Sequence, residues 1–239
     1  MKLATHNSKQ TTNNPMYILN IETATKNCSV SLAKNGETIL CKEIAEQGYS
    51  HAEKLHVFIE EILKETGIGV NDLNGIAVSK GPGSYTGLRI GVSAAKGLCF
   101  ANDIPLISIN SLEILAYTIP IDKGNIIPMI DARRMEVFSA FYDKNQLQIR
   151  TTLAEIIDET SYSEISEKIH LVGDGAAKFK EVLTDEKFVF HSDVVFPSAN
   201  EMSKLSFEKY QEKEKRSELR EHLLEFSTSK NDQSMLPIE

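Results

Sequence analysis

The sequence is short of cysteine, of positive charge and of long hydrophobic runs. Its three cysteines, Cys28, Cys41 and Cys99, are widely spaced and form no CxxC pair, which predicts small hydrophobic residues in a reducing compartment. No apolar run approaches the roughly 18–20 residues that span a bilayer, and no apolar signal core lies near the first residue. We therefore expect a cytoplasmic protein without membrane contact.

Acidic residues outnumber basic ones, 34 against 26, which gives a formal net charge of −8. This sign argues against broad binding of a nucleic-acid backbone by the chain alone, so any contact with nucleic acid would need a partner. With 239 residues, 41% of them hydrophobic, the chain can bury one large core or two modest ones.

Several catalytic and cofactor patterns are missing. The chain contains no P-loop, and the third glycine of a dinucleotide fingerprint is replaced by Thr86. His51 and His56 are five residues apart and do not share a helix face as a zinc pair would. No Gly-x-Ser-x-Gly string is present. We therefore expect no catalytic residue and no metal site in this chain.

The most distinctive stretch is residues 79–91, SKGPGSYTGLRIG. It follows an apolar strand at Gly75–Ser79 and leads into a helix over about Leu88–Ala101. A strand, a glycine turn and a helix N-terminus direct free backbone N–H groups toward an anion. Gly81 and Gly83 permit positive φ or a close backbone approach. A tight connection without any ligand remains the alternative.

Two predicted helices could form a docking face. Ser50–Thr66 begins with a capping box, Ser50 and Glu53, and carries an apolar stripe. The helix after the glycine turn has small residues four apart, so it either packs on its own sheet or accepts a second helix. If it docks a partner, Gly91→Leu should abolish binding while the monomer still folds.

The two halves of the chain open in the same way. Tyr17–Ile21 is an apolar strand that ends at Glu22, and a hairpin follows in which Asn35-Gly36 makes the turn. Ile126–Ile130 likewise ends at Asp131 and is followed by a turn and a return strand. Such a repeat predicts two lobes with a ligand cleft between them.

The remaining segments complete a domain scheme. Ile169–Val172 is a strand that runs into a second Gly-x-Gly turn before a further helix, and Ser198 and Glu201 are expected to cap a helix that carries Met202. We expect a disordered extension over residues 1–15, an N-terminal lobe over 16–121, a C-terminal lobe over 122–210 and a charged tail over 211–239.

The glycine stretch, together with Ile18–Thr25 and MIDARRMEVF at residues 129–138, closely resembles the TsaB (YeaZ) family over about residues 16–210. The resemblance implies a two-lobed α/β fold of the actin-like class (ASKHA, ribonuclease H-like), with duplicated mixed sheets flanked by helices. It implies a non-catalytic subunit of the bacterial complex that forms N6-threonylcarbamoyladenosine at position 37 of tRNA. The partners would be a TsaD-type catalytic subunit and a TsaE-type ATPase, with tRNA met through the complex. No cofactor would be required by the chain itself, nucleotide could lie at the subunit junction, and the chain alone would form a homodimer.

In that family the first two helices contact the catalytic subunit. The partner-binding residues expected here are Leu55, Phe58, Ile59, Ile62, Tyr85, Gly87, Arg89, Gly91, Ala94 and Ala95. The residues of a vestigial nucleotide or anion site would be Glu22, Thr23, Gly81, Gly83, Ser84, Asp131, Gly173 and Gly175.

Members of the superfold that hydrolyse ATP carry Asp-x-Gly-Thr/Ser at the first strand end, where this chain has Glu22-Thr23-Ala24-Thr25. The methyl group of Ala24 would stand where phosphate passes, so weak or absent ATP hydrolysis is expected. The alternatives are a small-molecule kinase or ATPase of the same superfold and, less well supported, a metallopeptidase.

Overall fold

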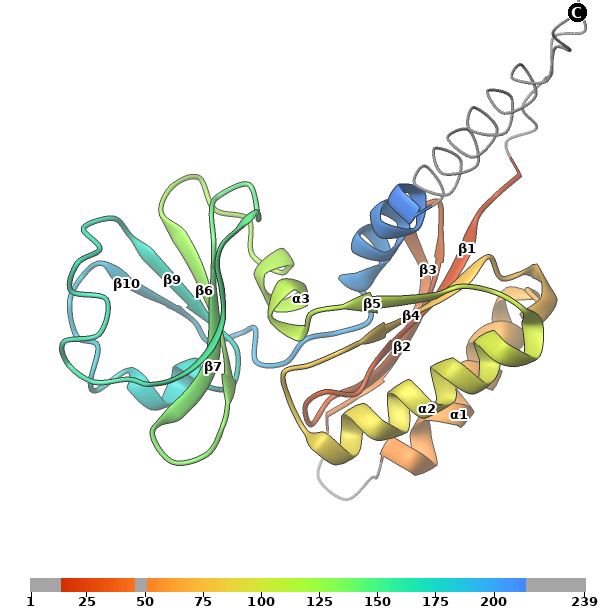
Figure 1. The fold of residues 1–239 in the computed structure, drawn as a ribbon, viewed down its shortest axis with the longest axis horizontal. Helices are drawn as coiled ribbons and strands as arrows, with labels where there is room; N and C mark the ends of the chain where they lie inside the picture. The colour runs from red at the N-terminus through yellow and green to blue at the C-terminus, as the bar shows by residue number, and fades with distance from the viewer. Residues whose placement is uncertain (1–13, 46–50, 214–239) are drawn as a thin grey trace, which may run out of the picture.

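The computed structural model describes residues 14–45 and 51–213. Two five-stranded mixed sheets lie side by side in Figure 1, one in each lobe. The expected residues 1–13 of the extension, Ser50 of the capping box and most of the charged tail lie outside the described residues.

The first sheet has the order β3-β2-β1-β4-β5. Its antiparallel part is made of β1 (Tyr17–Glu22), β2 (Cys28–Lys34) and β3 (Glu37–Ile44), and β4 (Gly75–Ser79) and β5 (Leu106–Ile109) run parallel to β1. The β2–β3 turn has positive φ at both Asn35 and Gly36, as the sequence predicts.

The second sheet repeats this connectivity. Its strands are β6 (Asn125–Asp131), β7 (Glu136–Tyr142), β8 (Gln148–Ile156), β9 (Ile169–Val172) and β10 (Phe188–His191), in the order β10-β9-β6-β7-β8. Strands β6, β7 and β8 are antiparallel neighbours, whereas β9 and β10 continue in parallel. The predicted duplication is therefore confirmed, and the chain has the two-lobed actin-like fold.

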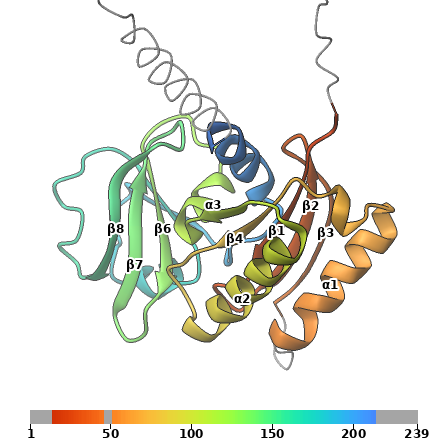
Figure 2. The same cartoon turned by 45° about the vertical axis from the view of Figure 1, so that its right-hand side comes forward.

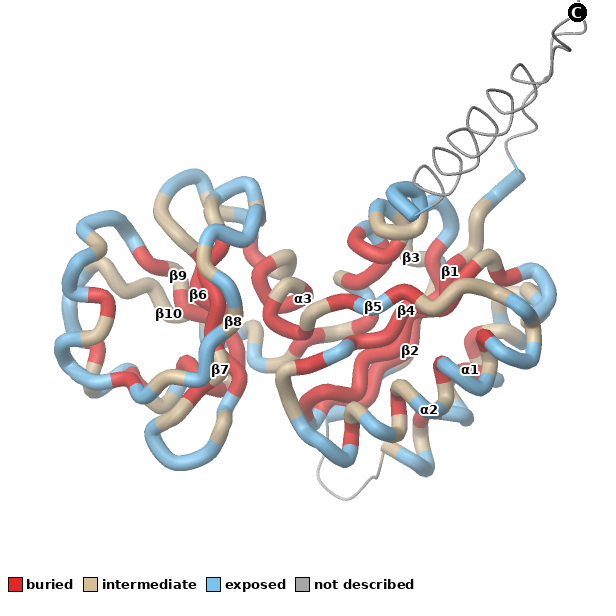
Figure 3. Tube along the Cα trace, viewed as in Figure 1, coloured by how far each residue is buried: buried red, intermediate tan, exposed pale blue. Residues whose placement is uncertain are grey.

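Helices α1 (His51–Thr66) and α2 (Tyr85–Asn102) cover the same face of the first sheet (Figure 2). The apolar stripe of α1 faces inward, as do Gly87, Gly91 and Ala95 of α2, and Figure 3 shows buried positions recurring among exposed ones along both helices. They form one core with β1, β2 and β4. A left-handed glycine, Gly67, follows the last turn of α1, as predicted.

The chain crosses back to the first lobe at its C-terminal end. Ala199, Met202 and Leu205 pack against Ile18 and Ile109 of the first sheet, and a helix runs over residues 202–213 up to the last described residue (Figure 1). These residues therefore belong to the first lobe and not to the second, where the sequence-based boundary of 122–210 puts them.

Hydrogen bonds fix this returning segment to the sheet. The backbone N–H of Ala199 donates to Ser29 Oγ at 2.8 Å, and Ser31 Oγ donates to the carbonyl of Ala199 at 2.6 Å. Ser198 lies four residues before the helix and donates to Glu43 at 2.6 Å, so the capping box expected from Ser198 and Glu201 is not formed.

Two shorter pieces complete the described chain. Helix α3 (Ser111–Tyr117) lies between the two sheets and packs mainly on β6 and β7. Single 3₁₀ turns occur at Val70–Asp72 and Ala176–Phe179, so the longer helix expected after Gly175 is one turn only. Among the described helices, none has the length and apolarity to cross a membrane.

Candidate functional site

The glycine turn before α2 is packed tightly onto the β1–β2 turn. Gly81 and Gly83 both have positive φ, at +92° and +153°. The N–H of Ser84 donates to the carbonyl of Ala24 at 2.6 Å, and a Cβ on Gly83 would lie 2.2 Å from that same oxygen. The turn therefore closes over Ala24, and glycine at position 83 is required by the contact.

The small residues of α2 serve the same packing. A Cβ on Gly87 would lie 2.1 Å from the carbonyl oxygen of Thr23, and one on Gly91 would lie 2.3 Å from Thr23 Oγ1. That hydroxyl donates to the carbonyl of Gly87 at 2.8 Å, which ties helix to strand end. The interpretation as packing on the chain's own sheet is therefore the correct one for this face of the helix.

Six of the ten expected partner-binding residues are consequently buried inside the first lobe. These are Leu55, Ile59, Ile62, Gly87, Gly91 and Ala95. A partner cannot touch their side chains in this structure, because their own sheet covers them. Phe58 and Ala94 are half-buried against the same core.

The opposite side of α2 is open and aromatic. Tyr85 is 74% exposed and Phe100 is 92% exposed, and the Arg89 guanidinium lies 5.2 Å from the centre of the Tyr85 ring. A shallow depression of about 390 Å³ follows the first turns, between Tyr85, Arg89 and Ser93. We define this outward face as Tyr85, Arg89, Ser93, Gly97 and Phe100.

Sequence reasoning missed Phe100 and Gly97 as surface residues. The signal was present, since at 100° per residue Tyr85, Arg89 and Phe100 fall on one side of a helix and Gly91 on the other. The sequence-based set includes Tyr85 and Arg89 from this outward face, but most of its members come from the apolar stripe of α1 and the small residues of α2 that face the sheet.

The two repeats carry a carboxylate at equivalent strand ends, but in different surroundings. Glu22 is 0% exposed, and its Oε1 accepts hydrogen bonds from the Ala24 N–H and from Ser79 Oγ at 3.0 Å. Burial raises the pKa of this carboxyl to about 7. Because Glu22 is sealed beneath the chain, it cannot touch a ligand in the cleft.

Asp131 is the open counterpart of Glu22 in the second lobe. Its Oδ1 accepts the N–H of Arg133 at 2.6 Å and is paired with the Lys178 ammonium. Partial burial opposes ionisation, but these two donors outweigh it and hold the pKa of Asp131 below its usual value. Burial, in contrast, raises the pKa of Asp174, which accepts the N–H of Asp131 at 3.0 Å.

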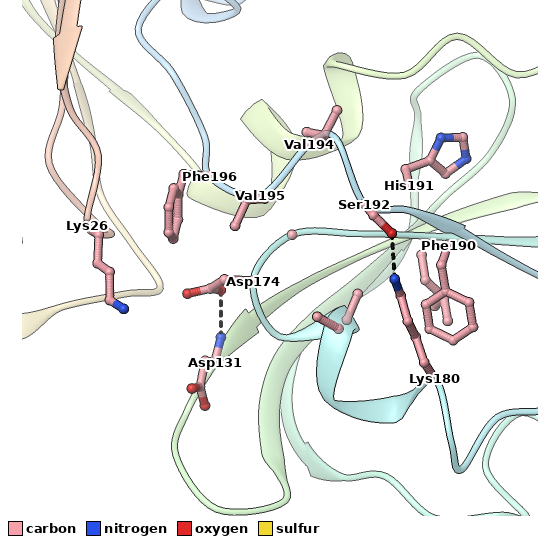
Figure 4. Close-up of a pocket in the computed structure, with 14 residues that line it drawn as sticks. Lys26, Asp131, Asp174, Lys180, Phe190, His191, Ser192, Val194, Val195 and Phe196 are labelled. Carbon is pink, nitrogen blue, oxygen red and sulfur yellow. Dashed lines mark hydrogen bonds between the residues drawn. The ribbon is translucent and has the colours of Figure 1, made fainter. Parts of the chain in front are cut away.

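Two adjoining pockets open between the lobes. The smaller, of about 300 Å³, has Asp174 and Phe190 on the second-lobe side, while Lys26 reaches toward it from the β1–β2 turn (Figure 4). In the same view Lys180 points away to Ser192, to which it donates at 2.7 Å. The larger pocket, of about 520 Å³, lies between the first turn of α2 and the β6–β7 turn.

The expected nucleotide or anion residues are only partly brought together. Gly83, Ser84 and Asp131 line the larger pocket, and Asp131 and Gly173 line the smaller. Glu22, Thr23, Gly81 and Gly175 are buried outside the linings of both pockets. Over residues 14–45 and 51–213, no group of three or more potential metal ligands comes together.

Comparisons with known proteins agree with this geometry. The family model of TsaD, tRNA N6-adenosine threonylcarbamoyltransferase, matches residues 38–223. The tRNA threonylcarbamoyladenosine biosynthesis protein TsaB of Haemophilus influenzae is 30% identical over 83% of this chain and 88% of its own length. The Escherichia coli protein of the same name is 28% identical over 82% and 88%.

Among solved structures, YeaZ from Pseudomonas aeruginosa superposes with a TM-score of 0.70 at 22% identity, covering 83% of this chain and 94% of that one. This likeness supports the fold alone. The glycine turn, the duplicated hairpins and the match to nearly the full length of curated relatives agree, and the chain belongs to the TsaB family.

Proposed function

We propose that this chain is a non-catalytic subunit that binds and activates a TsaD-type transferase in the formation of N6-threonylcarbamoyladenosine at position 37 of tRNA. Family membership supports the pathway. The observation that carries the binding role is the outward face of α2, where Phe100 is 92% exposed. An exposed aromatic ring on a rigid helix is typical of an interface anchor.

The likeness to the catalytic family supports the choice of partner. The TsaD model matches residues 38–223, and a transferase of this name from Listeria monocytogenes is 28% identical over 76% of this chain and 57% of its own length. Two chains of one fold can pair through equivalent helices. The isolated chain would form a homodimer through the same outward face of α2. In the cytoplasm, a TsaE-type ATPase and tRNA would bind to the complex that this chain forms with the transferase.

The sealed strand end supports a non-catalytic role. Glu22 has no route to the cleft, because Ala24 and Gly83 close over it. We expect purified protein alone to show no steady ATP turnover in a phosphate-release assay. Turnover that disappears in Glu22→Ala would contradict the proposal and favour the kinase or ATPase alternative.

Binding to the transferase is tested on the outward face of α2. Phe100→Ala should weaken the complex by about 2 kcal/mol, roughly 30-fold in Kd, because it removes an exposed aromatic anchor without touching the core. Tyr85→Ala should act in the same direction. Titration calorimetry with the transferase of the same organism measures both.

The matched control is Leu147→Ala, which removes a 65% exposed apolar side chain from the other lobe. It should bind as the wild type does, and complexes of the wild type and of this variant should form the modified nucleoside equally well. Unchanged affinity in both Phe100→Ala and Tyr85→Ala would exclude this face as the interface.

A further inference from the structure

The outward face of α2 is positively charged although the chain as a whole is acidic. The only charged residues of this helix are Arg89 and Lys96, and residues 73–102 contain no acidic side chain. Both cations are exposed. They lie on the same side of the helix as Tyr85 and Phe100, since at 100° per residue all four fall within about 60° of one another. The face that we propose as the interface therefore carries two positive charges and no negative charge from its own helix.

Neither cation has an ion-pair partner in the part of the chain that the structure describes, residues 14–45 and 51–213. The Arg89 guanidinium instead lies 5.2 Å from the centre of the Tyr85 ring, a cation–π contact. This contact positions the guanidinium at the wall of the shallow depression on the first turns of α2. Unpaired cations beside exposed aromatic rings favour a partner that carries carboxylates at matching positions.

The face has the same order of residue types in both directions along the helix. Tyr85 precedes Arg89 by four residues, and Phe100 follows Lys96 by four. A two-fold antiparallel contact between two copies would therefore place Tyr85 against Phe100 of the second copy. It would also place Arg89 against Lys96 of the second copy. The aromatic pairs favour such a homodimer, whereas the like charges oppose it.

We propose that α2 selects the transferase over a second copy of this chain by charge. The transferase presents two carboxylates about 10 Å apart, one opposite Arg89 and the other opposite Lys96, because these cations are two helical turns apart on one face. This inference rests on the proposed function, since it takes the outward face of α2 as the interface. The homodimer is then the weaker association, which the transferase displaces.

Reversing one charge should move the two associations in opposite directions. Lys96→Glu should weaken the complex with the transferase about tenfold, because the new carboxylate meets a carboxylate of the partner. It should tighten the homodimer about tenfold, because the same carboxylate would face Arg89 of the second copy. Arg89→Glu should give the same pair of results. Titration calorimetry of the complex and sedimentation equilibrium of the isolated full chain measure the two dissociation constants.

The double variant separates a specific charge pattern from a general change of charge. Arg89→Glu combined with Lys96→Glu should return the homodimer to about the affinity of the wild type, since two carboxylates repel as two cations do. It should weaken the complex about 100-fold. The matched control is Lys144→Glu, an exposed change in the β7–β8 turn that alters the net charge as much as either single variant does. This control should change neither dissociation constant.

Salt should also affect the two associations of the wild type in opposite ways. Raising sodium chloride from about 50 mM to about 500 mM screens exposed charges. The complex should therefore weaken, because attraction between opposite charges is lost, and the homodimer should tighten, because repulsion between cations is relieved. A complex that is unaffected by salt would contradict the charge selection.

The variants distinguish a failure of this inference from a failure of the proposed function. A Lys96→Glu protein in which both dissociation constants change in the same direction, or in which neither changes, would overturn selection by charge. If Phe100→Ala weakens the complex and the charge variants do not, the interface is correct and the charge inference is wrong. If neither the aromatic nor the charge variants alter the affinity for the transferase, the proposed interface itself is wrong.

Discussion

Replacing Gly91 with leucine should destabilise the first lobe severely, rather than leave a folded monomer that fails to bind its partner. Even a Cβ at this position would lie 2.3 Å from Thr23 Oγ1 and 3.5 Å from Ile21. The side chain of Thr23 cannot rotate away, because it is β-branched and its hydroxyl donates to the carbonyl of Gly87. Overpacking of this kind should cost about 3 kcal/mol or more, a large part of the free energy of unfolding of a typical domain.

Urea unfolding followed by circular dichroism measures the loss, and α2 itself provides the control. A Cβ built on Gly97 would have open space around it, since it would meet no atom within 4 Å apart from its chain neighbours and the helix's own backbone. Gly97→Ala should therefore stabilise the protein by about 1 kcal/mol, because alanine has the higher helix propensity. A Gly91→Leu protein of wild-type stability that no longer binds the transferase would restore the interpretation of Gly91 as a docking residue.

Glu22→Gln should remove a large part of the pH dependence of stability near neutrality. The pKa of the folded carboxyl is raised to about 7 from its ordinary value of 4.5, so the folded state holds the proton more tightly than the unfolded chain. The stabilisation is complete below about pH 4.5 and is lost as the pH rises through 7. The shift corresponds to about 3 kcal/mol between these limits.

Glutamine keeps the oxygen that accepts from Ala24 and Ser79 and carries no charge. The wild type should therefore lose free energy of unfolding from pH 5 to pH 8, whereas the variant should not. Urea titrations at both pH values should show this as a gain of the variant relative to the wild type. Glu60→Gln, an exposed change on α1, should show no such gain. An equal difference from the wild type at both pH values would show that Glu22 is ionised throughout.

Much of the fold follows from local sequence patterns. Strands β1, β2, β4, β6, β7 and β9 and helices α1 and α2 are predicted within a few residues, because their apolar residues are buried and periodic. The duplicated strand, acid and hairpin pattern is sufficient to predict two lobes. Strand β8 is missed, since it is an edge strand whose apolar residues, such as Ile156, face solvent.

The site is predicted less well, because its residues depend on long-range contacts. Glycines four apart permit close approach of another backbone, but the sequence does not say whether that backbone is the chain's own strand end or a partner's helix. Here it is the strand end at Thr23.

The return of the C-terminal segment to the first sheet determines when the first lobe can fold during synthesis and which fragments of the chain can be expressed. During synthesis Ile18 and Ile109 leave the ribosome long before Met202, which covers them. The first lobe therefore completes its core only when almost the entire chain has emerged. A fragment that ends at residue 121 would leave that apolar surface bare and prone to aggregation, whereas a fusion of residues 197–213 to the first lobe would restore its cover.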